Sequence, residues 1–505
     1  MFVVRGLPIL RCRSCGCVVL GTPRSAPDFS GFYPERKLAI DRGETPVDDI
    51  TERDATARYT EALRRRGVSA GSLLVVCGAH SRVDTEVFLA HARANGFRAE
   101  KLDPAEETDP SFRSGSYDAA IMLHQLQTQP EPGGLLRTIH RALRPGAPVL
   151  LTVPRVNSWP ARFFGRDWTE WRHANRLYFD QTTIQLLLLR FGFRDVLVRR
   201  DKRLYTPEHI YRRACDSPAT TLTRAISLVH TLLTPAPGFR VRLATSGMIV
   251  TAVRGDLPEG PKCSIIVAAY NERNSFPTLM DALLKKDFPG TDREIIVIES
   301  NSNDGTRELA AQYRTQPGVK LVFQERPLGK GNAIREGLRH ASGDVVLIQD
   351  ADLEYDLNDY EELLAPILSH QALFVLGTRH GGAWKMRRFA GQKGLAAVVN
   401  FGHVFFTGLI NILFRQKMTD PFTMFKVFHR DCLFGLEFSC NRFDFDHELV
   451  IKFVRKGYVP LEIPVNYSSR SFREGKKVRM FRDPLTWVWV DFKLRFSRLY
   501  RKTLA

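Results

Sequence analysis

The sequence predicts an α/β protein built from two doubly wound domains, and three observations lead to this prediction. In each half of the chain, short apolar strands alternate with segments of helical spacing, which is typical of parallel sheets covered by helices. Residues 255–261 are rich in proline and glycine and are expected to form a linker. In the second half, three predicted strands end in acidic clusters. We therefore expect one domain over residues 1–254 and another over 262–505.

Composition sets bounds on the size and partners of the protein. A chain of 505 residues has room for two or three domains, each with its own core. Its 44% hydrophobic and 25% charged residues are typical of globular proteins. A net charge of +18 indicates an anionic partner, such as a phosphate substrate or an acidic lipid surface. Because arginine is spread along the whole chain, nucleic acid is not an expected partner.

Cysteine usage and hydropathy favour a cytoplasmic protein that touches a membrane at most peripherally. The eight cysteines are scattered, and no signal peptide is evident at the start of the sequence. Cys12 and Cys15 form half of a zinc ribbon without a second pair nearby, so free thiols are expected. Residues 394–414 lack Asp, Glu, Lys and Arg but contain several polar residues, and we expect a buried or interfacial helix there.

The first half shows an alternating pattern from Ser72 onward. Predicted strands are residues 73–76, 98–102, 119–123 and 149–153, and predicted helices are residues 83–95 and 135–143. Three motifs, 117–118, 143–146 and 152–158, together with the later 178–180 and 191–193, resemble class I S-adenosylmethionine-dependent methyltransferases. The resemblance covers roughly residues 12–253 and implies a Rossmann-like fold. It also implies that Gly78 lies in the cofactor loop and that Asp103 holds the ribose.

The cofactor loop of the first half departs from that pattern. Residues 76–80 retain one glycine of the three that the family usually has, and side chains at the other two positions are expected to crowd a nucleoside. Two hypotheses follow. The first domain is either a retained fold that acts as a scaffold, or an active methyltransferase, in which case the protein is bifunctional and uses S-adenosylmethionine.

The second half places acids at the ends of its predicted strands. Strands are predicted at residues 263–269, 295–298, 320–323 and 345–348. The first is followed by Glu272, the second by Glu299 and Asp304, and the fourth by Asp350 and Asp352. Because the carboxyl ends of parallel strands meet at one sheet edge, these acids are expected to lie close together.

Two features of this edge indicate a metal ion that holds a diphosphate. Asp350 and Asp352 are separated by one residue, and Mg²⁺ or Mn²⁺ takes one or two protein carboxylates together with substrate phosphates. Lys330 stands between two glycines at a predicted helix start, where it can reach a phosphate. A solvated turn and ordinary helix caps are the structural alternatives for these residues.

Eight motifs of the second half resemble family-two glycosyltransferases of the GT-A fold, and the dolichyl- and polyprenyl-phosphate sugar transferases in particular. They are residues 269–272, 303–306, 329–331, 350–354, 377–379, 419–423, 443–448 and 473–477. The resemblance covers residues 262 to about 500. It implies inverting transfer of a sugar from a nucleoside diphosphate sugar, with a place in cell-surface polysaccharide or glycolipid assembly.

The resemblance also implies roles for individual residues. Donor-binding residues would be Tyr270, Glu272, Glu299, Asp304, Lys330 and Asp350, metal ligands would be Asp350, Asp352 and Glu354, and catalytic residues would be Asp352, Arg379, Asp444, Asp446 and Glu448. If the acceptor is a hydroxyl, one of the last three acids should be its general base, and all three share a face if that segment is extended. A phosphate acceptor needs cations instead, which Arg379, Arg470, Arg473, Lys476 and Lys477 could supply.

Two further hypotheses concern surfaces. The apolar segment 394–414 and the aromatic, basic tail 487–502 could rest on an anionic membrane and admit a lipid carrier, or they could be a core helix and a solvated tail. As an alternative to an enzyme, the basic chain could be a binding module for anionic polymers, which would bind salt-sensitively without the aspartates.

Overall fold

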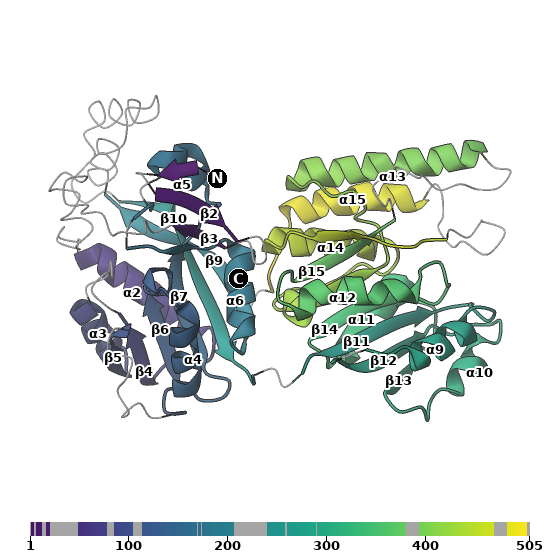
Figure 1. The fold of residues 1–505 in the computed structure, drawn as a ribbon, viewed down its shortest axis with the longest axis horizontal. Coiled ribbons are helices and arrows are strands. Elements are labelled where there is room, and N and C mark those ends of the chain that lie inside the picture. The colour runs from purple at the N-terminus through teal and green to yellow at the C-terminus, as the bar shows by residue number, and fades with distance from the viewer. Residues whose placement is uncertain are drawn as a thin grey trace. The chain divides into compact units, whose positions relative to one another are not determined.

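The structure is a computed structural model of the whole chain. It describes residues 2–4, 7–12, 17–20, 49–77, 85–104, 114–168, 170–172, 174–206, 240–257, 260–288, 290–379, 393–468 and 482–501. The chain divides into two compact units, Met1–Leu257 and Pro258–Ala505, and the division falls within the predicted linker 255–261. Each unit is described by itself (Figure 1).

The first unit is built on a six-stranded sheet. Its strands are β4 (Gly71–Val76), β5 (Phe97–Leu102), β6 (Ala119–Leu123), β7 (Pro148–Pro154), β9 (Phe193–Tyr205) and β10 (Val241–Arg254), in the spatial order β5-β4-β6-β7-β10-β9. The first four are parallel as predicted, whereas β10 runs antiparallel to both of its neighbours. β9 is antiparallel to β10 and therefore runs in the same direction as the first four strands, so that β10 alone is reversed among these six strands.

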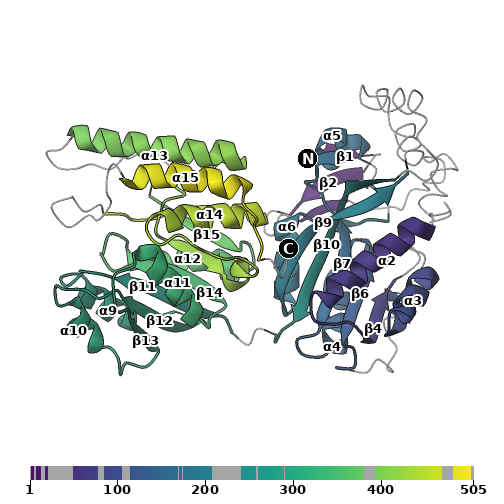
Figure 2. The same cartoon turned by 180° about the vertical axis from the view of Figure 1, so that it is seen from behind.

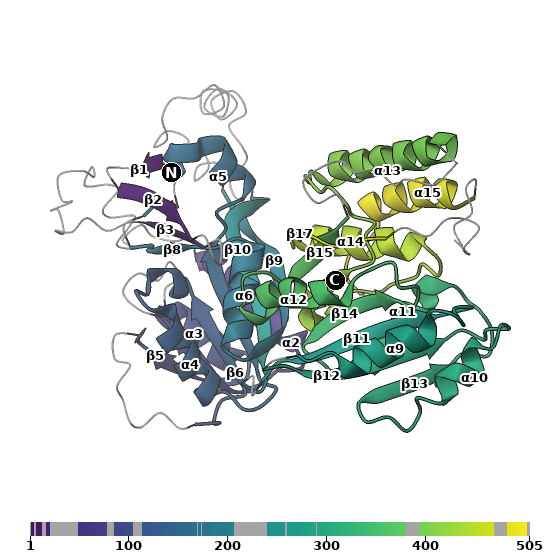
Figure 3. The same cartoon turned by 45° about the vertical axis from the view of Figure 1, so that its right-hand side comes forward.

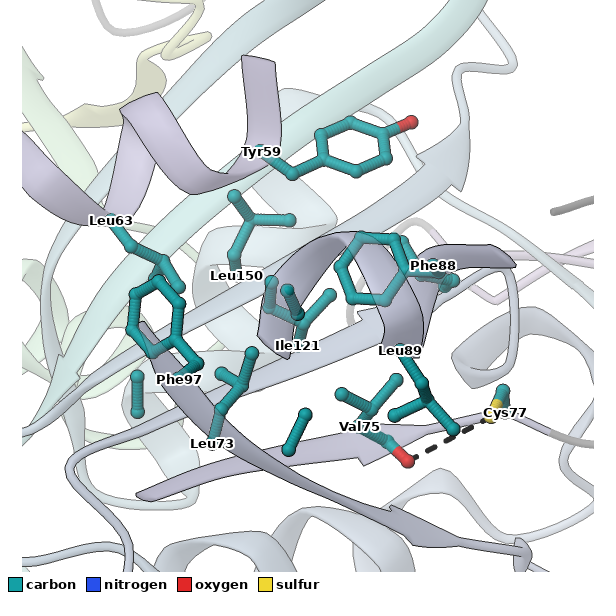
Figure 4. Packing of buried hydrophobic residues seen from close by; sticks show 14 of the residues in the cluster. Tyr59, Leu63, Leu73, Val75, Cys77, Phe88, Leu89, Phe97, Ile121 and Leu150 are labelled. Carbon is teal, nitrogen blue, oxygen red and sulfur yellow. Dashed lines mark hydrogen bonds between the residues drawn. The ribbon is translucent and has the colours of Figure 1, made fainter. Parts of the chain in front are cut away.

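Helices and one apolar cluster complete this unit. The helices are α2 (Asp49–Arg64), α3 (Thr85–Ala94), α4 (Pro132–Ala142), α5 (Trp159–Phe164) and α6 (Gln181–Arg190), with single 3-10 turns at Leu126–Thr128 and Gly165–Asp167. Figure 4 shows Tyr59 and Leu63 of α2 and Phe88 of α3 packed over Val75 and Ile121 of the sheet. This side of the parallel strands is thereby closed to water. The segment 226–233, for which a helix was expected, lies outside the described residues.

A small antiparallel sheet lies at the amino-terminal end. It consists of β1 (Phe2–Val4), β2 (Leu7–Arg11), β3 (Val18–Leu20) and β8 (Leu177–Tyr178), in that spatial order. It packs around the aromatic rings of Trp168, Trp171 and Tyr178. Cys12 and Cys17 are free thiols, and Cys15 lies outside the described residues.

The second unit is built on a seven-stranded mixed sheet. Its strands are β11 (Lys262–Ala269), β12 (Asp292–Glu299), β13 (Val319–Phe323), β14 (Val345–Asp350), β15 (Phe374–Thr378), β16 (Lys426–His429) and β17 (Leu461–Pro464), in the spatial order β13-β12-β11-β14-β16-β15-β17. The four strands predicted from the sequence are parallel to one another, and β15 and β17 also pair in parallel. β16 is antiparallel to both β14 and β15 and extends the sheet beyond the predicted strands.

Helices cover this sheet and continue beyond it. They are α9 (Phe276–Lys285), α10 (Thr306–Ala311), α11 (Lys330–His340), α12 (Tyr360–Leu368), α13 (Lys393–Phe414), α14 (Asp444–Lys456) and α15 (Arg482–Phe496), with 3-10 turns at Leu357–Asp359 and Arg430–Leu433. α13, α15 and α14 lie one on another, as the views from the front, the back and the side agree (Figures 1, 2 and 3). The predicted helix at 394–414 is thus present as α13. Among the described residues, no helix combines the length and the apolar character that a membrane crossing requires.

Candidate active site

The carboxyl ends of parallel strands meet at one edge of the second unit's sheet. β11 pairs with β12 on one side and with β14 on the other, so that Ala269 lies beside Glu299 and Ala268 beside Asp350. The order of strands reverses here, because β12 and β13 follow on one side of β11 and β14 on the other. In open α/β sheets, ligands bind in the crevice outside such a reversal point. The edge therefore fits the expected place of a substrate site.

The loops after β11 and β12 are tied to each other at this edge. The backbone N–H of Glu272 donates to Thr306 Oγ1 at 2.9 Å, and the N–H of Arg273 donates to an Asp304 carboxylate oxygen at 3.1 Å. Burial alone would raise the pKa of Asp304, but the hydrogen bonds from Thr306 and Arg273 lower it overall. Asp304 is therefore an ionised carboxylate that fixes its own loop.

The loop after β14 joins the same edge through one serine. Ser275 Oγ lies 3.0 Å from a carboxylate oxygen of Glu272 and 2.7 Å from the carbonyl oxygen of Ala351. Ala351 stands between Asp350 and Asp352. The structure thus brings the acids after β11 and β14 together, as the sequence predicts.

Lys330 opens α11, and its ammonium group lies against the carboxylates. Nζ is 2.6 Å from one carboxylate oxygen of Asp350 and 2.7 Å from the other. Burial alone would lower the pKa of Lys330, but the charges of Asp350, Asp446 and Asp352 raise it overall. The lysine therefore stays protonated and offsets part of the negative charge of the edge.

Two glycines allow α11 to begin at this place. A Cβ at Gly331 would lie 2.4 Å from Cβ of Phe445, and a Cβ at Gly329 would lie 2.5 Å from the carbonyl oxygen of Asn441. Gly329 also has a φ of +100°, which residues with side chains rarely adopt. The start of α11 is consequently pressed against the segment that leads into α14, and Lys330 is placed by that contact.

The chain turns sharply after Asp352. Leu353 has a φ of 57°, in the left-handed region, and the N–H of Glu354 donates to an Asp352 carboxylate oxygen at 3.2 Å. Glu354 accepts a hydrogen bond of 2.7 Å from the hydroxyl of Tyr467. Asp352 is partly buried. The turn thus directs Glu354, the third residue of the predicted metal set, toward Tyr467.

Asp446 is paired with a buried lysine that the sequence analysis did not single out. Lys426 Nζ lies 2.9 Å from a carboxylate oxygen of Asp446 and also donates to the carbonyl oxygen of Thr423. Burial lowers the pKa of Lys426, and the charge of Asp446 opposes that shift. The available signal was a lone lysine in the otherwise apolar strand β16.

Asp444, Asp446 and Glu448 do not share a face in the way that an extended segment would arrange them. They lie on α14, where successive residues turn by about 100° and the side chains two positions apart diverge. Glu448 accepts the N–H groups of Ser439 and Cys440 and pairs with Lys452 at 2.7 Å. Burial would raise the pKa of Glu448, but Lys452 lowers it overall. The condition under which the three acids would share a face, an extended segment, is therefore not met, because alternating aromatic and acidic residues also suit the first turns of a helix.

The carboxylate of Asp444, at the amino end of the same helix, also accepts a hydrogen bond from the protein. Its carboxylate accepts the backbone N–H of Arg442 at 2.9 Å. Glu299, at the end of β12, is fully buried, accepts the N–H of Ser302 at 2.7 Å and pairs with Arg307 at 2.7 Å. Both acids thus hold local backbone in place.

Arg379 follows β15 and is held by a buried aspartate. Its Nε and one terminal nitrogen each lie 2.7 Å from an oxygen of Asp420, and its guanidinium lies 5.2 Å from the ring centre of Tyr467. Burial would raise the pKa of Asp420, but Arg379 lowers it strongly. This bidentate pair leaves Arg379 neutralised within the protein. Tyr270, directly after β11, is partly buried.

Five predicted residues lie outside the described part of the chain: Gly78, Arg470, Arg473, Lys476 and Lys477. In the first unit, Asp103 directly follows β5, and the N–H of Cys77 donates to the carbonyl oxygen of Leu102 at 3.1 Å. Asp103 therefore lies beside the end of β4, at the sheet edge where the resemblance expects it.

A divalent cation fits the two aspartates by the chemistry of their donors. Asp350 and Asp352 supply hard carboxylate oxygens, and Mg²⁺ or Mn²⁺ completes its shell with water and substrate phosphates. Among the residues that the structure describes, no group of three or more His, Cys, Asp or Glu side chains is arranged to hold a metal by itself.

Both units match models of known families. Residues 264–434 match the model described as glycosyl transferase family 2, and residues 78–198 match the model described as methyltransferase domain. The two resemblances and the α/β fold class predicted from the sequence are thereby confirmed.

Similar curated proteins align with less than half of the chain. A dolichol-phosphate mannosyltransferase from Pyrococcus furiosus is 27% identical over 43% of this chain and 59% of its own length. A dolichyl-phosphate beta-glucosyltransferase from Trichomonas vaginalis is 29% identical over 41% of this chain and 63% of its own length. The chain thus spans about three fifths of the length of these relatives.

Among solved structures, glucosyl-3-phosphoglycerate synthase from Mycobacterium tuberculosis is similar to part of the chain. That crystal structure contains Mn²⁺, uridine-diphosphate-glucose and phosphoglyceric acid. It is 20% identical, covers 47% of this chain and 80% of its own, and superposes with a TM-score of 0.35.

Proposed function

We propose that the second unit, which carries the family-two glycosyltransferase domain, transfers a sugar with inversion from a nucleoside diphosphate sugar to a lipid phosphate. The observation that carries this proposal is the set of carboxylates from Glu272, Asp304, Asp350 and Asp352 at one sheet edge beside Lys330. Acids and a charged lysine in one crevice suit a diphosphate that is held through a cation. Such a reaction belongs to glycolipid or cell-surface polysaccharide assembly.

Different residues would bind different parts of the donor. Glu272 and Asp304 lie in loops after β11 and β12, on the side of the edge that would meet the nucleoside. Asp350 and Asp352 would hold Mg²⁺ or Mn²⁺ on the diphosphate, where the cation stabilises the charge that develops on the leaving group. Lys330, already charged at the start of α11, would meet a diphosphate oxygen.

The state of the three acids in residues 444–448 favours an anionic acceptor. Asp446 is paired with Lys426, Glu448 with Lys452 and two backbone N–H groups, and Asp444 accepts the N–H of Arg442. A general base must be able to take a proton, whereas each of these carboxylates is already engaged by its partner. Burial would raise the pKa of Glu448, but Lys452 lowers it overall. A phosphate acceptor is already anionic and needs no base. The names of the similar curated transferases agree with this choice.

Cations of a segment outside the described residues would supply the proposed acceptor site. Arg470, Arg473, Lys476 and Lys477 follow Tyr467 in the sequence, and the Tyr467 hydroxyl contacts Glu354 of the edge. Charge-assisted hydrogen bonds from such residues suit a phosphate monoester.

Two neighbouring helices support peripheral contact of this unit with an anionic membrane. On α13, Phe401 and Ile412 are 72% and 79% exposed, and on α15, Trp489 and Phe496 are 68% and 82% exposed. The spacings of eleven and seven residues place each pair on one face of its helix. Basic residues lie next to these pairs: Arg415, Lys417, Lys493, Arg495 and Arg498. Aromatic side chains beside basic ones suit the surface of an anionic bilayer.

A transfer assay tests the proposed reaction. The full chain is first screened against nucleoside diphosphate sugars by thermal shift with Mn²⁺ present, and the stabilising donor is then offered undecaprenyl phosphate or undecaprenol. We expect transfer to the phosphate, dependent on Mg²⁺ or Mn²⁺. Transfer to the alcohol alone would contradict the phosphate acceptor, and no stabilisation by any donor would contradict the glycosyltransferase assignment.

The membrane contact has its own test in a matched pair of tryptophans. Trp489→Ala is expected to weaken co-sedimentation with phosphatidylglycerol vesicles, because it removes an exposed aromatic side chain from α15. Trp159 of the first unit is 65% exposed and serves as the control. Equal losses in the two variants would count against the α13 and α15 surface.

A further inference from the structure

A layer of aromatic rings lies beneath the two exposed helices of the second unit. The ring of His447 on α14 lies 4.5 Å from that of Phe422 and 5.3 Å from that of Trp487 on α15, measured between ring centres. Phe406 on α13 lies 5.3 Å from Trp487 and 6.0 Å from His447. We call these four residues the aromatic layer. It joins α13, α14 and α15.

A buried hydrogen bond between a histidine and a carboxylate crosses this layer. His447 Nδ1 lies 2.8 Å from a carboxylate oxygen of Asp491 on α15, and the two side chains are 1% and 0% exposed. The second carboxylate oxygen of Asp491 is buried and has no hydrogen-bond partner among the residues that the structure describes. Burial of such a pair is costly, and apolar residues of similar volume often stabilise a fold equally well. Packing of the helices alone therefore does not account for these two residues.

The pair connects to the candidate active site through adjacent residues. His447 follows Asp446, whose carboxylate lies 2.9 Å from Lys426 on the inner side of α14. Phe422, which contacts the His447 ring, lies between Asp420 and Thr423 in the chain. Asp420 clamps Arg379, and Thr423 accepts a hydrogen bond from Lys426. The chain neighbours of His447 and Phe422 thus contact charged groups of the site. Asp446 and Thr423 contact Lys426, and Asp420 contacts Arg379.

We propose that the His447–Asp491 pair is a positioning element that couples the lipid-facing helices α13 and α15 to the charged groups around Asp446. This inference rests on the proposed membrane contact and names a link between that surface and the site. When α15 settles on an anionic lipid surface, Asp491 fixes the His447 ring and with it the first turns of α14.

The geometry of the pair explains why a hydrogen bond serves this purpose. Stacked rings can slide over each other at little cost, whereas a hydrogen bond to a carboxylate has a preferred distance and direction. A shift of α15 therefore moves the His447 ring with it. Because Asp446 is the next residue on a rigid helix, it follows the same movement.

Amide hydrogen exchange of the full chain tests the coupling without donor or transfer. With wild-type protein, phosphatidylglycerol vesicles are expected to slow exchange in the first turns of α14 about fivefold or more, the lower end of ordinary coupling between sites. The double variant His447→Phe, Asp491→Leu replaces the pair with apolar side chains and keeps the ring stack. It is expected to fold and to bind vesicles as before, but to lose the slowing in α14.

The control variant is Lys456→Met, which removes a buried charge from the far end of the same helix. It is expected to keep the slowing of exchange in α14. The proposal is overturned if the double variant responds to vesicles as the wild type does, or if vesicles leave α14 unchanged in the wild type. Neither outcome bears on donor binding or transfer, which the assay of the proposed function measures separately.

Discussion

Single residues decide how charge is distributed at the sheet edge. Lys330 contacts both oxygens of Asp350, whereas Asp352 keeps its carboxylate next to the turn at Leu353. A cation bound with a diphosphate would compete with Lys330 for Asp350. The resemblance makes Asp352 both a metal ligand and a catalytic residue, so its charge is the first to test.

The variants Asp352→Asn and Glu354→Gln distinguish the contributions of the two carboxylates to metal binding and transfer. We expect Asp352→Asn to lower transfer on the order of 100-fold or more and to weaken Mn²⁺ binding in the presence of nucleoside diphosphate, since an electrostatic stabiliser of the leaving group is lost. Glu354→Gln should have a much smaller effect, because Glu354 is engaged with Tyr467. Titration calorimetry and initial rates measure both, and equal effects would restore Glu354 as a ligand.

The surroundings of Asp201 in the first unit predict that the free energy of unfolding depends on pH. This carboxylate is 1% exposed and lies 2.7 Å from Arg58 and 2.6 Å from Arg203. Burial would raise its pKa, but Arg203 and Arg58 lower it from 3.8 to about 2. A lowered folded-state pKa contributes stability above the unfolded value, and this contribution is lost as the pH falls from about 4 to about 2.

The expected loss is about 2 kcal/mol over that pH window. Urea unfolding of the wild type and of Asp201→Asn, followed by circular dichroism, measures it as the difference in pH dependence. Asp118→Asn is the control, because its partner Arg144 is 54% exposed and surface pairs contribute little. An Asp201→Asn variant with unchanged acid sensitivity would contradict the prediction.

At the scale of elements, contacts between helices position the side chains of the candidate site more than the strands do. The start of α11 touches residues 441–445, and α14 in turn carries Asp446. The alternating aromatic and acidic residues of segment 443–448 would suit a strand. In the structure, Asp446 and Glu448 lie on a helix, where they pair with Lys426 and Lys452 respectively. Tertiary partners thus decided its conformation.

Gly331→Ala tests the contact between α11 and the start of α14. Its Cβ would lie 2.4 Å from Phe445, so α11 must move and carry Lys330 away from Asp350. We expect weaker donor binding and a lower melting temperature. Gly402→Ala on α13 meets nothing within 4 Å and should instead stabilise its helix by about 1 kcal/mol. If the two variants changed donor binding and melting temperature in the same way, the contact between α11 and the start of α14 would not position Lys330.

At the scale of the whole molecule, two compact units each present the carboxyl edge of a sheet, and among the described residues acids from several loops are tied together at the edge of the second. The first unit keeps the methyltransferase fold and Asp103, while its predicted cofactor loop has one glycine of three. Fold and ligand binding are separate properties, because binding depends on a few side chains of the loop.

A titration of the full chain compares the two units. We expect S-adenosylmethionine to give no thermal shift and no heat, because the side chains that replace two family glycines in residues 76–80 are expected to crowd a nucleoside. Nucleoside diphosphate with Mn²⁺ should stabilise the same sample and serves as its positive control. A saturable S-adenosylmethionine signal would favour the bifunctional protein.

The sequence by itself determined the alternation of strands and helices, the family resemblance of each half and the acids that follow β11, β12 and β14. These properties are local, since apolar periodicity and strand-end residues are written within short segments. Only the tertiary structure decided that Lys426 faces Asp446, that Asp420 holds Arg379 and that residues 444–456 form a helix. Each of these depends on partners far away in the chain, and the energy of a buried charge is set by whichever group the fold brings within hydrogen-bond distance.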